Sequence, residues 1–144
     1  MTIYAIDFDG TIVEEKFPEI GALKPEAAEF IRHIQQNGDK WILFTLREDK
    51  YLEDAVAFLL VNDLIPDAIN DNLPEKIRQW GNNPRKISAD IYIDDRNANG
   101  LSWPWDSIQT SHPAPCHPHS YPSYPLYPSH PCSRSSSNPP EVRP

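Results

Sequence analysis

The sequence predicts an α/β fold in which a parallel β-sheet lies between layers of helices, as a three-layer sandwich. Two observations support this class. Short apolar segments rich in β-branched and aromatic residues alternate with amphipathic segments along the first hundred residues, and such alternation is typical of strands joined by right-handed helical crossovers. The polar residues suited to chemistry come directly after the strands, where ligands bind in open parallel sheets.

The first half of the chain predicts two strands around one helix. Residues 2–7 (TIYAID) are a short apolar run stopped by Asp-Gly, which indicates a buried strand. Residues 25–36 carry apolar side chains at helical spacing, with a proline at the start and Asn37-Gly38 after the end, which indicates a helix. Residues 40–46 (KWILFTL) are the second predicted strand.

The alternation continues in the following fifty residues. Residues 52–61 place their apolar side chains on one stripe and predict a helix. Residues 67–70 predict a short strand, residues 75–80 a short helix and residues 90–94 (DIYID) a fourth strand. The predicted folded domain covers residues 1–108.

Residues 109–144 have a different composition. Eleven of the 16 prolines follow Trp103, and a Pro-, Ser- and His-rich segment without apolar periodicity predicts a disordered tail. Tyrosines at every third position between 121 and 127 also suit a polyproline II ligand for an aromatic groove. The sequence is compatible with a functional tail, a fusion and a reading-frame artefact.

Charge and hydropathy argue against several classes of protein. The segment after Trp103 has two arginines against one aspartate and one glutamate, so the first 103 residues carry the whole net charge of −8, which opposes binding to nucleic-acid backbones. The longest apolar run, residues 55–61, is far shorter than the ~20 residues that span a bilayer, and no signal-peptide pattern is present. We expect a cytoplasmic protein with no membrane partner, and a homo-oligomer is compatible with the sequence.

Polar side chains follow three of the predicted strands. Asp7 and Asp9 come after the first strand, Thr45 ends the second, and Asp94 and Asp95 follow the fourth. Because carboxylates that share a pocket repel one another, such a site needs a cation, and Mg²⁺ takes carboxylate oxygens together with waters and substrate phosphates. The pattern predicts a Mg²⁺ site beside a phosphoryl group.

These residues resemble the motifs of the haloacid dehalogenase superfamily of phosphohydrolases. The resemblance rests on residues 7–11 (DFDGT), Thr45 and Asp94-Asp95. Residues 85–97 (RKISADIYIDDRN) are similar to a group of small bacterial and phage hydrolases of that superfamily. The resemblance covers residues 1–108 and implies a Rossmann-like sandwich.

Members of this superfamily often carry a cap domain after the first motif or between the second and the last. Here only 13 residues separate Thr11 from Pro25, which is room for a hairpin-like flap. The predicted helices and strand already occupy the chain from Thr45 to Asp94. We therefore expect no cap domain.

The resemblance implies a role for each motif residue. Asp7 would be the nucleophile that forms an aspartyl-phosphate, and its other oxygen would bind Mg²⁺. Asp9 would be the general acid and base, with its backbone carbonyl reaching the metal. Thr45 would bind the phosphate, and Asp95, with Asp94 beside it, would ligate the metal.

Two basic groups have competing interpretations. The superfamily requires a lysine that holds nucleophile and phosphate together, and Lys86 is preferred because it lies in the segment that matches the narrower group; Lys76 is the alternative. Arg47, two residues after Thr45, is either a substrate anchor or a solvated loop charge.

The sequence thus predicts a Mg²⁺-dependent phosphatase that hydrolyses small phosphomonoesters through an aspartyl-phosphate. One alternative is a nucleic-acid 3′-end phosphatase, which an uncapped site would admit but the net charge opposes. The other is a non-catalytic binding module that uses the Pro/Tyr tail as a ligand, which the presence of both Asp7 and Asp9 opposes.

Overall fold

A computed structural model describes residues 1–107 of the chain; the predicted tail, residues 109–144, lies outside the described residues. The described elements are, in chain order, β1 (Ile3–Ile6), α1 (Pro25–Asn37), β2 (Lys40–Leu43), α2 (Asp49–Val61), β3 (Ala68–Ile69), α3 (Pro74–Trp80), β4 (Ile91–Ile93) and a 3-10 turn, Trp105–Ser107. Each predicted strand and helix is present. The observed strands are shorter than predicted, by one residue at each end of β1, β3 and β4 and by three residues at the end of β2.

The four strands form a parallel sheet in the order β3-β2-β1-β4. β1 is central, and its last residue, Ile6, pairs with Leu43 of β2 and with Ile93 of β4. The residues that follow β1, β2 and β4 therefore emerge side by side at one edge of the sheet. The predicted α/β class with a parallel sheet is confirmed.

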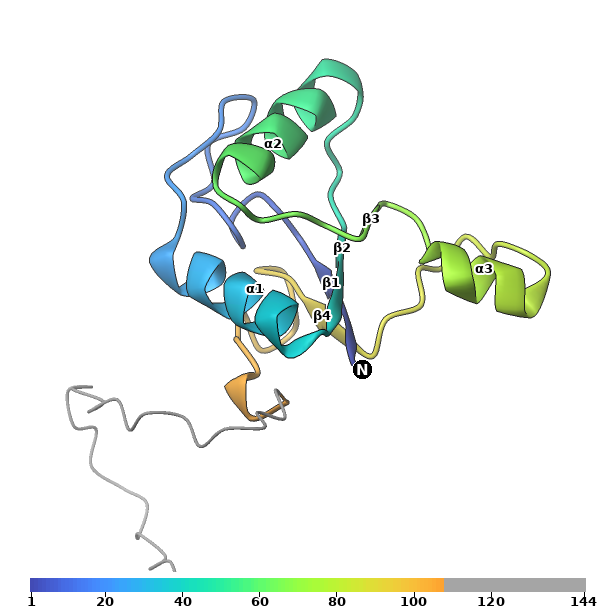
Figure 1. The fold of residues 1–144 in the computed structure, drawn as a ribbon. Coiled ribbons are helices and arrows are strands. Elements are labelled where there is room, and N and C mark those ends of the chain that lie inside the picture. Colours follow the sequence, from blue (N-terminus) through green and yellow to red (C-terminus); the bar gives the residue numbers. More distant parts are fainter. Residues whose placement is uncertain (108–144) are drawn as a thin grey trace, which may run out of the picture. The chain divides into compact units, whose positions relative to one another are not determined.

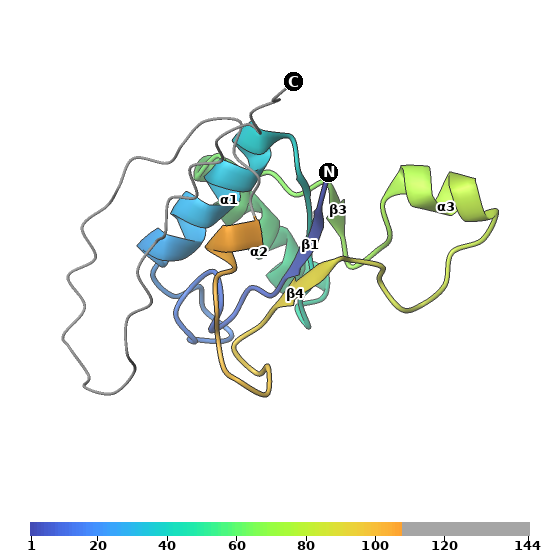
Figure 2. The ribbon, with the colours of Figure 1, turned by 90° about the horizontal axis from the view of Figure 1, so that it is seen from below.

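The two faces of the sheet are covered differently, one by helices α1 and α2 and the other by the residues that flank α3. Figure 2 shows α1 and α2 on one side of the sheet and α3 on the other. Toward α1 and α2, Tyr4 and Trp41 belong to a large apolar cluster without solvent exposure. On the other face, Ile3 and Ile42 pack with Leu73 and Ile87, which lie before and after α3. The arrangement is the predicted Rossmann-like sandwich of three layers.

α1 has sequence signals at both ends. Pro25 occupies the first turn, where its missing N–H costs no hydrogen bond. Gly38 ends the helix with φ of 78° and donates its N–H to Gln35, a left-handed geometry that glycine adopts without steric cost. The five buried residues of α1 lie on one stripe: Ala27, Ala28, Phe30, Ile31 and Ile34.

The domain continues past β4 onto α1. The rings of Trp103 and Trp105 lie 5.2 and 5.1 Å from the ring of Phe30, centroid to centroid. Because aromatic pairs at this separation add to the burial of apolar area, this segment completes the α1 face. The composition changes at Trp103, but the packed structure extends at least to Trp105.

The segment around α3 is held by polar contacts. α3 buries none of its residues and projects from the sheet (Figure 1). Asn72, only 2% exposed, donates to Asn83 and to the carbonyl of Pro84, both at 2.9 Å, and accepts from the N–H of Ser88 at 2.7 Å. The amide side chain of Asn72 thus joins the residues before α3 to the residues after it.

In residues 1–107 no helix has the length and apolarity that crossing a bilayer requires.

Candidate functional site

A cleft of about 460 Å³ opens at the edge of the sheet where β1, β2 and β4 end. Its lining combines carboxylates, a hydroxyl, two arginines and apolar side chains. The lining residues are Asp7, Asp9, Glu15, Phe17, Phe44, Thr45, Leu46, Arg47, Asp94 and Arg96. The structure therefore brings together most of the predicted site residues.

Three carboxylates converge beside this cleft. Asp7, Asp94 and Asp95 each offer an oxygen, and these oxygens lie within 4.8 Å of one another. Burial, chiefly, and the nearby charges of Asp94 and Asp95 raise the pKa of Asp7 from its ordinary 3.8 to about 7, although hydrogen bonds from Phe8 and Thr11 oppose the shift. Three oxygen donors in a site where negative charge is disfavoured fit a hard divalent cation such as Mg²⁺.

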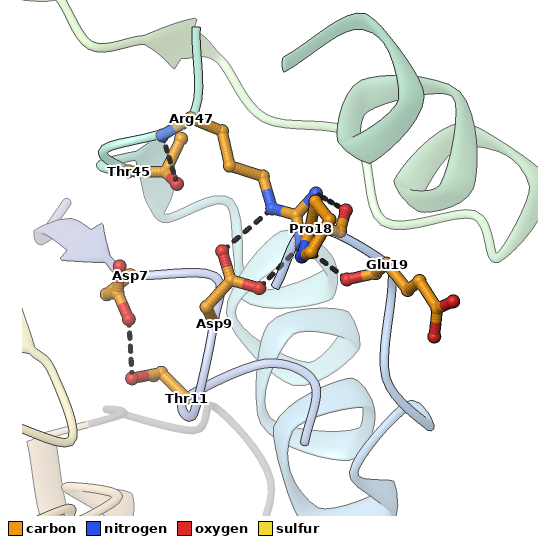
Figure 3. A network of polar contacts seen from close by, with 7 residues as sticks. All are labelled: Asp7, Asp9, Thr11, Pro18, Glu19, Thr45 and Arg47. Carbon is orange, nitrogen blue, oxygen red and sulfur yellow. Dashed lines mark hydrogen bonds and ion pairs between the residues drawn. The ribbon is translucent and has the colours of Figure 1, made fainter. Parts of the chain in front are cut away.

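Thr11 ties two of the three aspartates together. Its hydroxyl donates to Asp7 at 3.0 Å and accepts from the backbone N–H of Asp95 at 2.9 Å. Figure 3 shows Thr11 directed at Asp7. Thr11 is fully buried, so this bridge is shielded from competing water. The sequence interpretation gave Thr11 no role of its own, although its place in the same turn as the aspartates was a usable signal.

Gly10 makes room for Asp95. Its φ is +80°, and a Cβ built on it would lie 2.4 Å from the Oδ2 of Asp95. The turn after β1 thus requires glycine both for its left-handed backbone and for the close approach of a carboxylate.

Asp9 does not join the carboxylate cluster. It accepts from Arg47 in a two-pronged pair, with Nε to Oδ2 and Nη2 to Oδ1 both at 2.7 Å (Figure 3). Arg47 is 2% exposed, and its hydrogen bonds to Asp9 raise the pKa of the guanidinium further. This corrects the interpretation of Arg47 as a solvated loop charge, whereas its interpretation as a substrate anchor stays a prediction. The predicted contact between the Asp9 carbonyl and a metal stays a prediction.

The same guanidinium holds the loop over the cleft, residues 14–22, which we call the flap. Arg47 donates to the carbonyls of Pro18 at 3.2 Å and Glu19 at 2.7 Å. It lies 5.2 Å from the ring centroids of both Phe8 and Phe17, a cation–π distance. The flap is closed at its base by a hydrogen bond from Glu14 to Ala22, and it is the short loop expected in place of a cap.

Thr45 lies in the cleft with its backbone fixed from β3. Its N–H donates to the side chain of Asn70 and its carbonyl accepts from the same amide, both at 2.8 Å. Its hydroxyl accepts from the N–H of Arg47 at 3.2 Å. Asn70 follows directly after β3. The sequence predicted no site residue at the end of this strand, so Asn70 was missed.

Neither predicted lysine reaches the cleft. Lys86 is exposed and lines a separate hollow with Trp80 and Tyr92, and Lys76 lies on α3. The prediction of Lys86 is corrected because residue 86 precedes β4, and the neighbouring N–H of Asp90 bonds Ile3 at the start of β1. Lys86 therefore sits toward the amino-terminal edge of the sheet.

A different lysine contacts the turn after β1. The ammonium of Lys24 donates to the carbonyl of Gly10. Lys24 comes directly before Pro25, the first residue of α1. From this position its side chain reaches the turn formed by residues 7–11. The sequence offered no separate signal for it.

A solved structure of a conserved protein from Bacteroides thetaiotaomicron is similar to this chain. The two are 38% identical, the match covers 70% of this chain and 81% of that chain, and the TM-score is 0.63. No protein-family model matches the sequence, and no curated protein matches it.

Proposed function

We propose that this chain, which belongs to the same family as the conserved protein from Bacteroides thetaiotaomicron, is a Mg²⁺-dependent phosphatase of the haloacid dehalogenase superfamily. The observation that carries the proposal is the meeting of Asp7, Asp94 and Asp95 within 4.8 Å at the ends of β1 and β4. Such a cluster beside a buried threonine is suited to a metal and a phosphoryl group together.

In the proposed reaction Asp7 is the nucleophile. One of its oxygens attacks phosphorus, the new O–P bond forms, and the bond from phosphorus to the alcohol oxygen breaks. Protonated Asp9 gives its proton to the departing alkoxide. In the second step Asp9 takes a proton from water, the water oxygen attacks the aspartyl-phosphate, and inorganic phosphate leaves with Asp7 restored.

The neighbouring residues prepare Asp7 for this role. Thr11 fixes one of its oxygens at 3.0 Å, which leaves the other to attack. Thr45 offers a hydroxyl proton to the phosphoryl group. Asp7, Asp94 and Asp95 would hold Mg²⁺, which when bound supplies positive charge that favours the ionised nucleophile and offsets the charge of the phosphate.

The cleft favours a small phosphomonoester with an apolar portion. Phe17, Phe44 and Leu46 line it and are 55%, 42% and 87% exposed, so an apolar group entering the cleft would cover surface now in water. Nucleic acid is a poorer candidate, because a chain with net charge −8 repels a phosphate backbone.

The test is hydrolysis of p-nitrophenyl phosphate by the full chain. We expect turnover with Mg²⁺, none with EDTA, and none in Asp7→Asn, because an amide cannot form the acyl phosphate. Asp106→Asn, which removes an equal charge from an exposed position, is the matched control and should keep wild-type activity. Asp7→Asn activity within about tenfold of wild type would contradict the proposal, since loss of a covalent route raises the barrier by several kcal/mol.

A further inference from the structure

Arg47 links three parts of the site that lie far apart in the sequence. It follows β2, it pairs with Asp9 after β1, and it holds the carbonyls of Pro18 and Glu19 in the flap. Figure 3 shows the guanidinium between Asp9 and these two residues. Its four hydrogen bonds to these groups occupy four of the five N–H groups of the guanidinium, so it has little capacity to bind a substrate as well.

The link is rigid because Arg47 is enclosed. The side chain is buried, with its guanidinium 5.2 Å from the ring centroids of Phe8 and Phe17, and a buried guanidinium is retained only where its charge is paired. In residues 1–107 the carboxylate of Asp9 accepts from no other side chain. Arg47 thus supplies both of the side-chain hydrogen bonds that orient the Asp9 carboxylate among the described residues.

The backbone of Arg47 is also tied to the proposed phosphate site. Its N–H donates to the hydroxyl of Thr45 at 3.2 Å, which turns the chain back over the cleft. The residue that would bind phosphate, the residue that would donate the proton and the flap are therefore all connected through Arg47, the first by its backbone N–H and the other two by its guanidinium.

We propose that Arg47 is a positioning residue that aims Asp9 and couples it to the flap. Both Asp9 oxygens accept from Arg47 in this structure, so one of these hydrogen bonds must break for that oxygen to carry the proton, while the other keeps Asp9 aimed. This role rests on the proposed function, in which Asp9 is the general acid.

The test compares two aryl phosphates that differ in their need for a proton. 2,4-Dinitrophenolate leaves without protonation, whereas phenolate from phenyl phosphate needs much more help. We measure kcat/KM, which reports the first phosphoryl transfer, for both esters. Asp9→Asn shows how the loss of the general acid changes these values: kcat/KM should fall far more for phenyl phosphate than for 2,4-dinitrophenyl phosphate.

We expect Arg47→Met and Arg47→Lys to give the same pattern. The ratio of kcat/KM for phenyl phosphate to that for 2,4-dinitrophenyl phosphate should fall at least about tenfold, since a positioned acid contributes 10²–10⁴. The ratio is independent of the fraction of protein that is folded. Arg32→Met, at an exposed arginine of α1, is the matched control and should leave the ratio within about twofold.

The coupling to the flap has its own readout. Hydrogen exchange in the peptide covering residues 14–22 should become faster in Arg47→Met, whereas α1 should be unaffected.

Three results would overturn the inference. If kcat/KM falls equally for both esters in the Arg47 variants, Arg47 acts in packing or in substrate anchoring. This result refutes the positioning role but leaves the proposed function standing. Unchanged exchange in the flap refutes the coupling. If the unaltered chain hydrolyses neither ester, the proposed function itself fails and the role of Asp9 falls with it.

Discussion

Replacing Asp7 by asparagine should stabilise the metal-free protein at alkaline pH. The pKa of Asp7 is raised from 3.8 to about 7, so between these values the folded state binds more protons than the unfolded state. By linkage, the stability contributed by this group falls as pH rises through that window and stays low above pH 7. Asparagine is uncharged in both states and is free of this loss.

The structure sets the size of the effect. A shift from 3.8 to about 7 would correspond to about 4 kcal/mol at 1.36 kcal/mol per unit. Because Asp7 is only partly buried, solvent screening reduces this to roughly 1–3 kcal/mol. For a domain of this size the gain is a rise in Tm of roughly 5–15 °C. The amide oxygen can still accept from Thr11, so the bridge is kept.

The assay is thermal unfolding of wild type and Asp7→Asn in EDTA at pH 4.5 and pH 8. We expect a clear rise in Tm at pH 8 and a small one at pH 4.5, where Asp7 is protonated in the folded state. Asp106→Asn, at an exposed site, should shift Tm by little at either pH. An equal shift at both pH values, or a lower Tm of Asp7→Asn at pH 8, would refute the reasoning.

Three further outcomes follow from the site and the packing. Millimolar Mg²⁺ should raise the Tm of the wild type at pH 8, because binding to the folded state alone stabilises it, and Asp95→Ala should remove most of that rise in a titration followed by melting. Gly10→Ala should lower Tm and abolish the Mg²⁺ response, since its Cβ would lie 2.4 Å from Asp95; a normal response would show that the turn can relax. Truncation after Gln109 should leave kcat within about twofold of the full chain. A truncation that removes Trp103 and Trp105 as well should lower Tm, because it exposes the face of α1 that they cover. Equal Tm values of the two truncated proteins would contradict that packing.

The order of strands and helices was predictable because each element carries local signals. Apolar runs that end in polar residues marked β1, β2 and β4, and Pro25 and Gly38 marked the ends of α1. The same signals placed Asp7 and Asp94 at one edge of the sheet, since parallel strands share the direction of their ends.

The contacts of Arg47 were beyond such signals. Its partner Asp9 is 38 positions away, and pairing at that separation depends on how the flap folds over the cleft. The prediction of Lys86 as the lysine of the site was wrong for a different reason. The prediction weighed similarity of the segment, while the direction of β4 already places a residue before that strand at the other edge.

Asn72 joins the two ends of the segment that contains α3, and this affects where residues can be inserted into the chain. The two ends of this segment are held at hydrogen-bond distance, through Asn83, Pro84 and Ser88, and the helix between them buries nothing. Lengthening a loop whose ends are already joined adds little closure entropy, about 0.6 kcal/mol for each doubling of its length. We therefore expect a foreign peptide or a small domain inserted after α3 to leave the sheet and the edge that bears the carboxylate cluster undisturbed.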